Sequence, residues 1–184
     1  MVTLPLALYL GVVSAVTLQR VIELLISRRN VAWARKRGAV EHGRAQYPVM
    51  VALHTAFLIG CVVEVVLCDR PFRLELAVPM FALLLGAQIL RVWCIRTLGP
   101  YWNTRVLVIP CAHRVTQGPY AWLRHPNYLA VAIEGFALPL LHGAWLTAIA
   151  FSLANAVLLA VRMRCEDRVL PQTELEQLML LEDA

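Results

Sequence analysis

A segment of mixed polar and aromatic residues, 118–128, has the residue types and spacing of a site for a charged small molecule. It reads Gly-Pro-Tyr-Ala-Trp-Leu-Arg-His-Pro-Asn-Tyr. Its Gly-Pro pair predicts a turn, and Pro126 predicts the first turn of a helix, where the missing N–H costs nothing. Arg124 and His125 would then lie at the N-terminus of that helix, where free N–H groups and the helix dipole favour anions.

The same segment also has a purely structural interpretation. Three of its residues are aromatic and suit a membrane–water interface: Tyr120, Trp122 and Tyr128. In that case the segment starts a helix and anchors it, without chemistry.

Polar side chains also recur inside strongly apolar stretches, where they are costly and indicate function. The first apolar stretch has one polar face, formed by Arg20, Glu23, Ser27 and Asn30. The last has another, formed by Ser152, Asn155, Arg162 and Glu166. For the first face we favour an Arg20–Glu23 ion pair. For the second, hydrogen bonding between helices explains Ser152 and Asn155 better than it explains the two charged residues.

Two further carboxylates lie within apolar stretches. Glu134 is either an internal partner for an arginine or part of a pocket wall. Glu64 lies near the end of its stretch, and we expect it to be a solvated or snorkelling carboxylate.

The composition identifies the kind of element that must hold these residues. The chain has 184 residues, of which 60% are hydrophobic and 16% charged, and its mean hydropathy is +0.65. Soluble domains are about a quarter charged, so the composition argues against an ordinary water-soluble fold. The high hydrophobic content excludes intrinsic disorder. We predict an all-α, polytopic membrane bundle in a single domain.

Five stretches approach the roughly 20 apolar residues that a membrane-spanning helix needs. We predict spans at Val2–Ile26, Val49–Leu67, Leu74–Ile95, Pro126–Leu141 and Ala144–Met163. The fourth is short, so it is tilted or partly interfacial. Residues 1–95 would hold three spans, 96–125 a cytosolic connection, 126–170 a catalytic hairpin and 171–184 a tail, which could be an interfacial helix.

Basic residues are unevenly distributed between the connections. One side would hold Arg28, Arg29, Arg35, Lys36, Arg37, Arg44, Arg91, Arg96, Arg105, Arg114, Arg124, Arg162, Arg164 and Arg168, and the other only Arg70 and Arg73. The positive-inside rule therefore places the N-terminus outside, and the long connections and the C-terminus in the cytosol. We expect an integral protein of the bacterial inner membrane, with its site facing the cytosol.

Metal and nucleic-acid sites are not expected. The cysteines, which are Cys61, Cys68, Cys94, Cys111 and Cys165, form no CxxC pair. No basic surface interleaved with aromatic residues indicates single-strand binding. The partners we expect are the lipid bilayer and a lipophilic acceptor, and the oligomeric state stays open.

The motif order resembles a known family. Gly-Pro-Tyr, then Arg-His-Pro-x-Tyr, a short helical hairpin, and Arg162, Arg164, Glu166 and Asp167 at its end are similar to the isoprenylcysteine carboxyl methyltransferase family. The remainder is most similar to a bacterial branch that O-methylates alkylpyrones and related phenolic lipids. In the family the second acid is commonly Glu, and a glycine with spaced tyrosines often follows it. Here the second acid is Asp167, and Leu170-Pro171-Gln172 follows.

The resemblance implies S-adenosylmethionine as cofactor. It implies that Gly118, Tyr120, His125, Pro126, Tyr128 and Glu166 form the cofactor site. We assign catalytic roles to His125, as a general base where one is needed, and to Arg124, which would steer an acceptor oxyanion. Acceptor contacts are assigned to Glu134, Asn155 and Arg162.

Several functions stay open at this point. The acceptor oxygen could belong to an alkylpyrone or alkylresorcinol hydroxyl, or to a prenylcysteine carboxylate. A membrane reductase of the sterol-reductase type, using NADPH, is one alternative to the methyltransferase. A non-enzymatic scaffold or transport subunit is the other.

Overall fold

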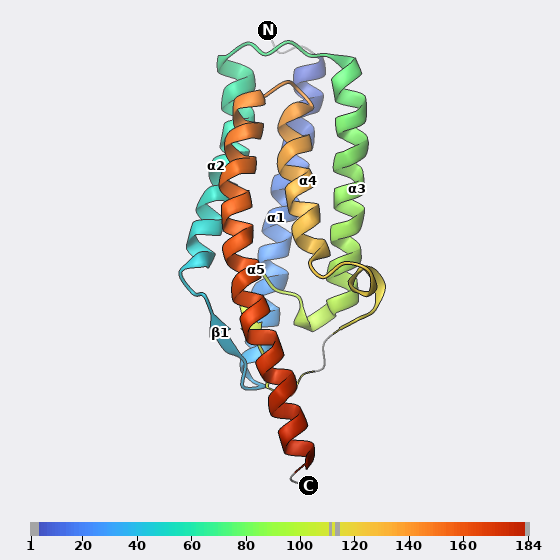
Figure 1. Cartoon of the computed structure of the whole chain (residues 1–184). Coiled ribbons are helices and arrows are strands. Elements are labelled where there is room, and N and C mark those ends of the chain that lie inside the picture. The colour runs from blue at the N-terminus through green and yellow to red at the C-terminus, as the bar shows by residue number, and fades with distance from the viewer. Residues whose placement is uncertain (1–3, 111, 113–114, 183–184) are drawn as a thin grey trace.

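Five helices form an up-and-down bundle in the computed structural model, which describes residues 4–110, 112 and 115–182, with side chains to residue 169 (Figure 1). They are α1 (Leu4–Arg35), α2 (Gln46–Leu67), α3 (Leu74–Leu98), α4 (Pro126–Leu140) and α5 (Trp145–Glu182). Cys111 and Arg114, used in the sequence analysis, lie outside the described residues, as do the side chains of the expected tail.

Four helices are long and apolar enough to cross a membrane, by length and composition. They are α1, α2, the segment Leu74–Tyr101 that contains α3, and Trp145–Val169 of α5. The remaining predicted span, α4, has 15 residues, or about 22 Å at 1.5 Å per residue. It packs mainly against α3 and α5. The predominantly helical fold is compatible with a membrane bundle.

A small sheet departs from the all-α prediction. Strands β1 (Val40–His42) and β2 (Val106–Val108) pair antiparallel, with Glu41 opposite Leu107. They lie at the end of the bundle where α1 and α3 finish and where α2 and α4 begin (Figure 1). We call this the sheet end. Two 3-10 helices, η1 (Gly99–Tyr101) and η2 (Gly118–Ala121), lie in the α3–α4 connection.

The opposite end joins α4 to α5 through a tight link, with Gly143 in the left-handed region at φ +71. Glu64 corrects one expectation here, because its carboxylate is buried rather than solvated. It accepts hydrogen bonds from the backbone N–H groups of Leu146 and Thr147 at 3.1 and 2.7 Å, and it pairs with Arg70 at 2.9 Å. Glu64 therefore satisfies free N–H groups in the first turn of α5.

Helices α4 and α5 approach closely at Gly135. A Cβ atom at that position would lie 2.2 Å from Cε1 of Phe151. This close approach sets the spacing of the hairpin that carries Tyr128 and Glu166 at the sheet end.

Candidate functional site

A cavity of about 380 Å³ opens within the helices, in the part of the bundle nearer the sheet end. All five helices line it, together with β2, η1 and η2. Its volume is within the range of small-molecule sites. Both polar faces predicted from the sequence contribute to it, through Arg20 and Glu23 on α1 and through Asn155, Arg162 and Glu166 on α5.

The motif segment forms one wall of this cavity at the sheet end. Gly118 adopts φ +56, and a Cβ there would lie 2.7 Å from Oγ1 of Thr97, so the turn requires glycine. Tyr120 on η2 lines the cavity, and burial raises the pKa of its hydroxyl. Pro126 begins α4 as predicted and is buried. Gly118 and Pro126 thus set the backbone, and their neighbours present side chains to the cavity.

Two basic residues of the motif face two acids of α5. Arg124 pairs with Asp167 at 3.0 Å, and the His125 ring lies 3.2 Å from Asp167 through Nε2 and 3.5 Å from Glu166 through Nδ1. Hydrogen bonding to Glu166 is the main cause of a raised pKa for His125, and Asp167 adds to it. The imidazolium form is therefore favoured, which suits anion binding better than proton acceptance.

Tyr128 connects this group to the interior. Its hydroxyl donates to Glu166 and accepts from Nε of Arg162 at 3.3 Å. Its ring stacks on His125, with centroids 5.4 Å apart and planes at 18°. Arg162 is buried, and its NH2 also donates to the Thr104 carbonyl at 3.1 Å. We call Arg124, His125, Tyr128, Arg162, Glu166 and Asp167 the charged cluster.

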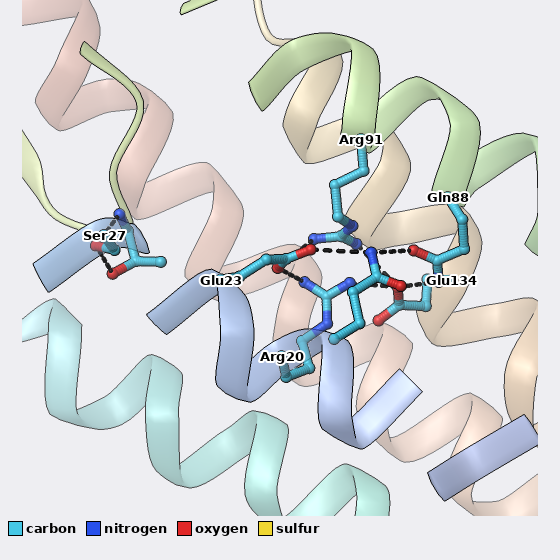
Figure 2. Close-up of polar contacts among 8 residues, drawn as sticks. Arg20, Glu23, Ser27, Gln88, Arg91 and Glu134 are labelled. Atoms are coloured by element: carbon cyan, nitrogen blue, oxygen red, sulfur yellow. Dashed lines mark hydrogen bonds and ion pairs between the residues drawn. The ribbon is translucent and has the colours of Figure 1, made fainter. Parts of the chain in front are cut away.

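A second network lies deeper in the bundle (Figure 2). Arg20 pairs with Glu23 at 2.5 Å, as predicted, and with Glu134 at 2.6 Å. Glu134 also binds Arg91 at 3.0 Å and accepts from Gln88 at 2.8 Å. Of the two alternatives for Glu134, the internal partner for an arginine is the one observed. Glu134 lies behind the lining, whereas Arg20, Glu23 and Arg91 reach the cavity.

Arg91 corrects a further expectation. We expected it in the cytosolic connection, but it is buried inside α3 as a partner of Glu134. Its charge is compensated there, so it carries no information about membrane orientation.

The polar face of α1 also holds the long connection in place. Ser27 contacts Thr104, with 2.8 Å between the hydroxyl oxygens, and Asn30 donates to the Trp102 carbonyl at 2.5 Å. Beside them, Glu41 of β1 pairs with Arg105 at 2.6 Å. Burial opposes ionisation of Glu41, but hydrogen bonds from Arg105 and Arg35 outweigh it and lower the pKa of the carboxyl. The predicted extended segment at 104–110 contains β2, and its pairing with β1 was not predicted.

Two polar residues of α5 do not have the contacts predicted from the sequence, and one residue of the cavity was not predicted at all. Ser152 Oγ and Asn155 Oδ1 are buried without a hydrogen-bond partner among the described residues, so these atoms do not join helices as expected. Asn155 faces the cavity, as does Asn127, whose Oδ1 is likewise buried and unpartnered. His54 on α2 lines the cavity and was missed. A lone histidine in an apolar stretch has no pattern that identifies it.

The chemistry of the lining suits a zwitterionic ligand with additional positive charge. At the sheet end, the Glu166 carboxylate, the guanidinium groups of Arg124 and Arg162, the His125 imidazole and tyrosine rings line one space. Within the described ranges, no group of three or more His, Cys, Asp or Glu side chains could hold a metal ion.

Comparison with known sequences identifies related proteins. The sequence model of the isoprenylcysteine carboxyl methyltransferase (ICMT) family matches residues 80–172. An uncharacterized Bacillus subtilis protein, YpbQ, is 39% identical over 161 residues, covering 87% of this chain and 95% of YpbQ. An uncharacterized protein of Haemophilus influenzae is 25% identical over 80% of this chain and 86% of its own length. The whole charged cluster falls inside the range that the family model matches.

Proposed function

The chain belongs to the isoprenylcysteine carboxyl methyltransferase family, whose members are membrane methyltransferases, and from this premise we propose that it uses S-adenosylmethionine to O-methylate a lipophilic acceptor. The observation that carries the proposal is that oppositely charged side chains of the charged cluster face one another at one end of the cavity. Arg124 and His125 lie on one side, and Glu166 and Asp167 on the other.

These residues fit the chemical groups of the cofactor. Arg124 and the His125 imidazolium suit its carboxylate. Glu166 suits its ammonium group or a ribose hydroxyl, and the faces of Tyr120 and Tyr128 suit its sulfonium by cation–π attraction. When bound, S-adenosylmethionine supplies an electrophilic methyl group. The chain's own contribution is to hold both reactants in line and to exclude water, which is worth roughly 7–11 kcal/mol in well-oriented reactions.

The acceptor would enter from the bilayer. Apolar side chains of α2 and α5, such as Leu58 and Leu158, line the cavity beyond the charged cluster, and they suit a hydrocarbon tail. Arg162 and Asn155 lie where the acceptor's polar head would meet them, whereas Glu134 would act through Arg20 and Arg91. An alkylpyrone or alkylresorcinol hydroxyl, as in the bacterial branch, and a prenylcysteine carboxylate are the two acceptor classes. We assign the sheet end to the cytosolic face of a bacterial inner membrane.

Isothermal titration of the detergent-purified protein with S-adenosylhomocysteine tests the cofactor. We expect 1:1 binding in the wild type and a loss of at least tenfold in affinity in His125→Ala. The matched control is His42→Ala, which removes a histidine of β1 that does not line the cavity. Binding of NADPH instead would favour a reductase, and binding of neither by folded protein would favour a scaffold.

A further inference from the structure

His54 is a basic side chain in the cavity that the proposed cofactor site does not use. It lies on α2, and its ring meets Phe151 edge-on, with centroids 5.3 Å apart and planes at 88°. It lines the cavity, and it makes no side-chain hydrogen bond to any residue that the structure describes. Its ring nitrogens are therefore not committed to holding the fold together.

The position of His54 relates it to the charged cluster. Met50, one helical turn before it on the same face of α2, contacts NH1 of Arg162 through its sulfur at 3.7 Å. Arg162 in turn donates to the Tyr128 hydroxyl. One turn is about 5.4 Å along the helix axis. His54 thus lies one turn deeper than the proposed cofactor site, where an acceptor from the bilayer would meet it.

The other basic groups of the cavity already have acidic partners. His125 lies between Glu166 and Asp167. In the described part of the chain, each arginine of the lining has an acid within 4.0 Å: Arg20 with Glu23, Arg91 with Glu134, Arg105 with Glu41, Arg124 with Asp167 and Arg162 with Glu166. These groups are held in their charged forms by their acidic partners, and a guanidinium cannot accept a proton, so they cannot take the proton that a hydroxyl acceptor must lose.

Resting on the proposed function, we propose that His54 is the general base for hydroxyl acceptors. The acceptor O–H bond breaks and its proton passes to a ring nitrogen of His54, while the oxygen forms a bond to the methyl carbon. The carbon–sulfur bond of the cofactor breaks, and its electron pair stays on sulfur. The imidazolium then returns the proton to water. A carboxylate acceptor, already ionised, has no need of this step.

Charged side chains of four other helices affect the charge of the His54 ring through electrostatic interactions. They are Arg20 of α1, Arg91 of α3, Glu134 of α4 and Arg162 of α5. Glu134 is held in place by Gln88 and by two of these arginines. Burial and the surrounding arginines favour the neutral ring, which is the form that a general base needs, and Glu134 is the one of these charges that stabilises the imidazolium created by proton transfer.

The test compares His54→Gln with His42→Gln in lipid nanodiscs, with a long-chain 5-alkylresorcinol as acceptor. General-base catalysis contributes about 10²–10⁴-fold, so we expect His54→Gln to lower kcat by that factor and to lose the acidic limb of the pH–rate profile. His42→Gln should match the wild type. Binding of S-adenosylhomocysteine to His54→Gln should stay within about twofold of the wild type, which also shows that the variant is folded.

Two further measurements distinguish loss of proton transfer from a general loss of activity in the variant. In the wild type carrying ¹⁵N-histidine, the alkylresorcinol alone should shift one set of ring-nitrogen NMR signals, and these should be absent from His54→Gln. A fluorinated alkylphenol, ionised at the assay pH, should restore turnover in the variant. Unchanged kcat on the alkylresorcinol, or no rescue by the ionised phenol, would overturn the role of His54. Absence of S-adenosylhomocysteine binding in the wild type would instead overturn the proposed function itself.

Discussion

The Tyr128 hydroxyl on α4 donates a hydrogen bond to the Glu166 carboxylate on α5, and this contact joins the two helices of the hairpin at the edge of the cavity. The same hydroxyl accepts from Nε of Arg162, which lies one turn before Glu166. A phenol therefore fixes the geometry of an acid and a base that both face the proposed cofactor site.

Removing this hydroxyl tests its role. Hydrogen bonds to charged groups contribute about 1.5–3 kcal/mol, and 1.4 kcal/mol is a factor of ten in affinity. We expect Tyr128→Phe to weaken S-adenosylhomocysteine binding by about tenfold or more in calorimetry. Tyr47→Phe, which changes a tyrosine that does not line the cavity, is the matched control. Equal affinity in both variants would show that Glu166 needs no positioning by Tyr128.

The buried network around Glu134 supports a prediction about stability. Breaking a buried ion pair by removing one partner costs about 3–5 kcal/mol, because the other charge stays buried. Glu134→Gln leaves Arg20 and Arg91 with only Glu23 as an acidic partner. In detergent, we expect Tm to fall by about 10 °C, against little change for Glu75→Gln at an exposed position of α3. A Tm within 2 °C of the wild type would contradict the network's stabilising role.

Local features of this fold could be predicted from the sequence, and its long-range contacts could not. Pro126 as the start of α4 and the Arg20–Glu23 pair follow from neighbours in the chain, since helix periodicity and proline geometry are local rules. The pairing of Arg91 with Glu134 depends on α3 lying beside α4. A hydrophobic pattern shows which residues are apolar but does not show which helices are neighbours.

The same limit explains the errors at the two ends of the bundle. Glu64 satisfies the start of α5, more than 80 residues further along the chain, and no residue near it in sequence indicates that. Strands β1 and β2 pair over only three residues each, and the Glu41–Arg105 ion pair lies beside them. Such short strands in two distant connections leave no pattern in the sequence. His54 was missed because its neighbours across the cavity, and not its neighbours in sequence, distinguish it.

The pKa of His125 predicts a pH-dependent stability. Because Glu166 and Asp167 raise this pKa in the folded protein, protonation of His125 contributes stability that is fully present below the unfolded value of about 6.5. That contribution is lost as pH rises through the higher folded value. We expect the Tm advantage of the wild type over His125→Gln to be largest at about pH 6 and to decrease as pH rises above the unfolded value. In an Asp167→Asn background, the advantage at pH 6 should be smaller. A difference that grows with pH would contradict the charged form of His125.

The distance between α4 and α5 at Gly135 should affect how Tyr128 and Glu166 are positioned in the proposed cofactor site. A Cβ at Gly135 would meet the Phe151 ring at 2.2 Å, so Gly135→Ala must push the helices apart or displace the ring. Overpacking of this kind costs about 1–3 kcal/mol. Since Tyr128 and Glu166 lie on the same two helices, we expect weaker S-adenosylhomocysteine binding as well as a lower Tm.

The matched control is Gly86→Ala on α3, where a Cβ would meet nothing within 4 Å. It should keep the affinity and raise Tm slightly, because alanine favours a helix by up to about 1 kcal/mol over glycine. Phe151→Leu removes the ring atoms that the new methyl group would meet. Combined with Gly135→Ala, it should cost less than the sum of the two single changes, as expected for residues in contact. Strict additivity, with unchanged binding in Gly135→Ala, would show that hairpin spacing does not govern the charged cluster.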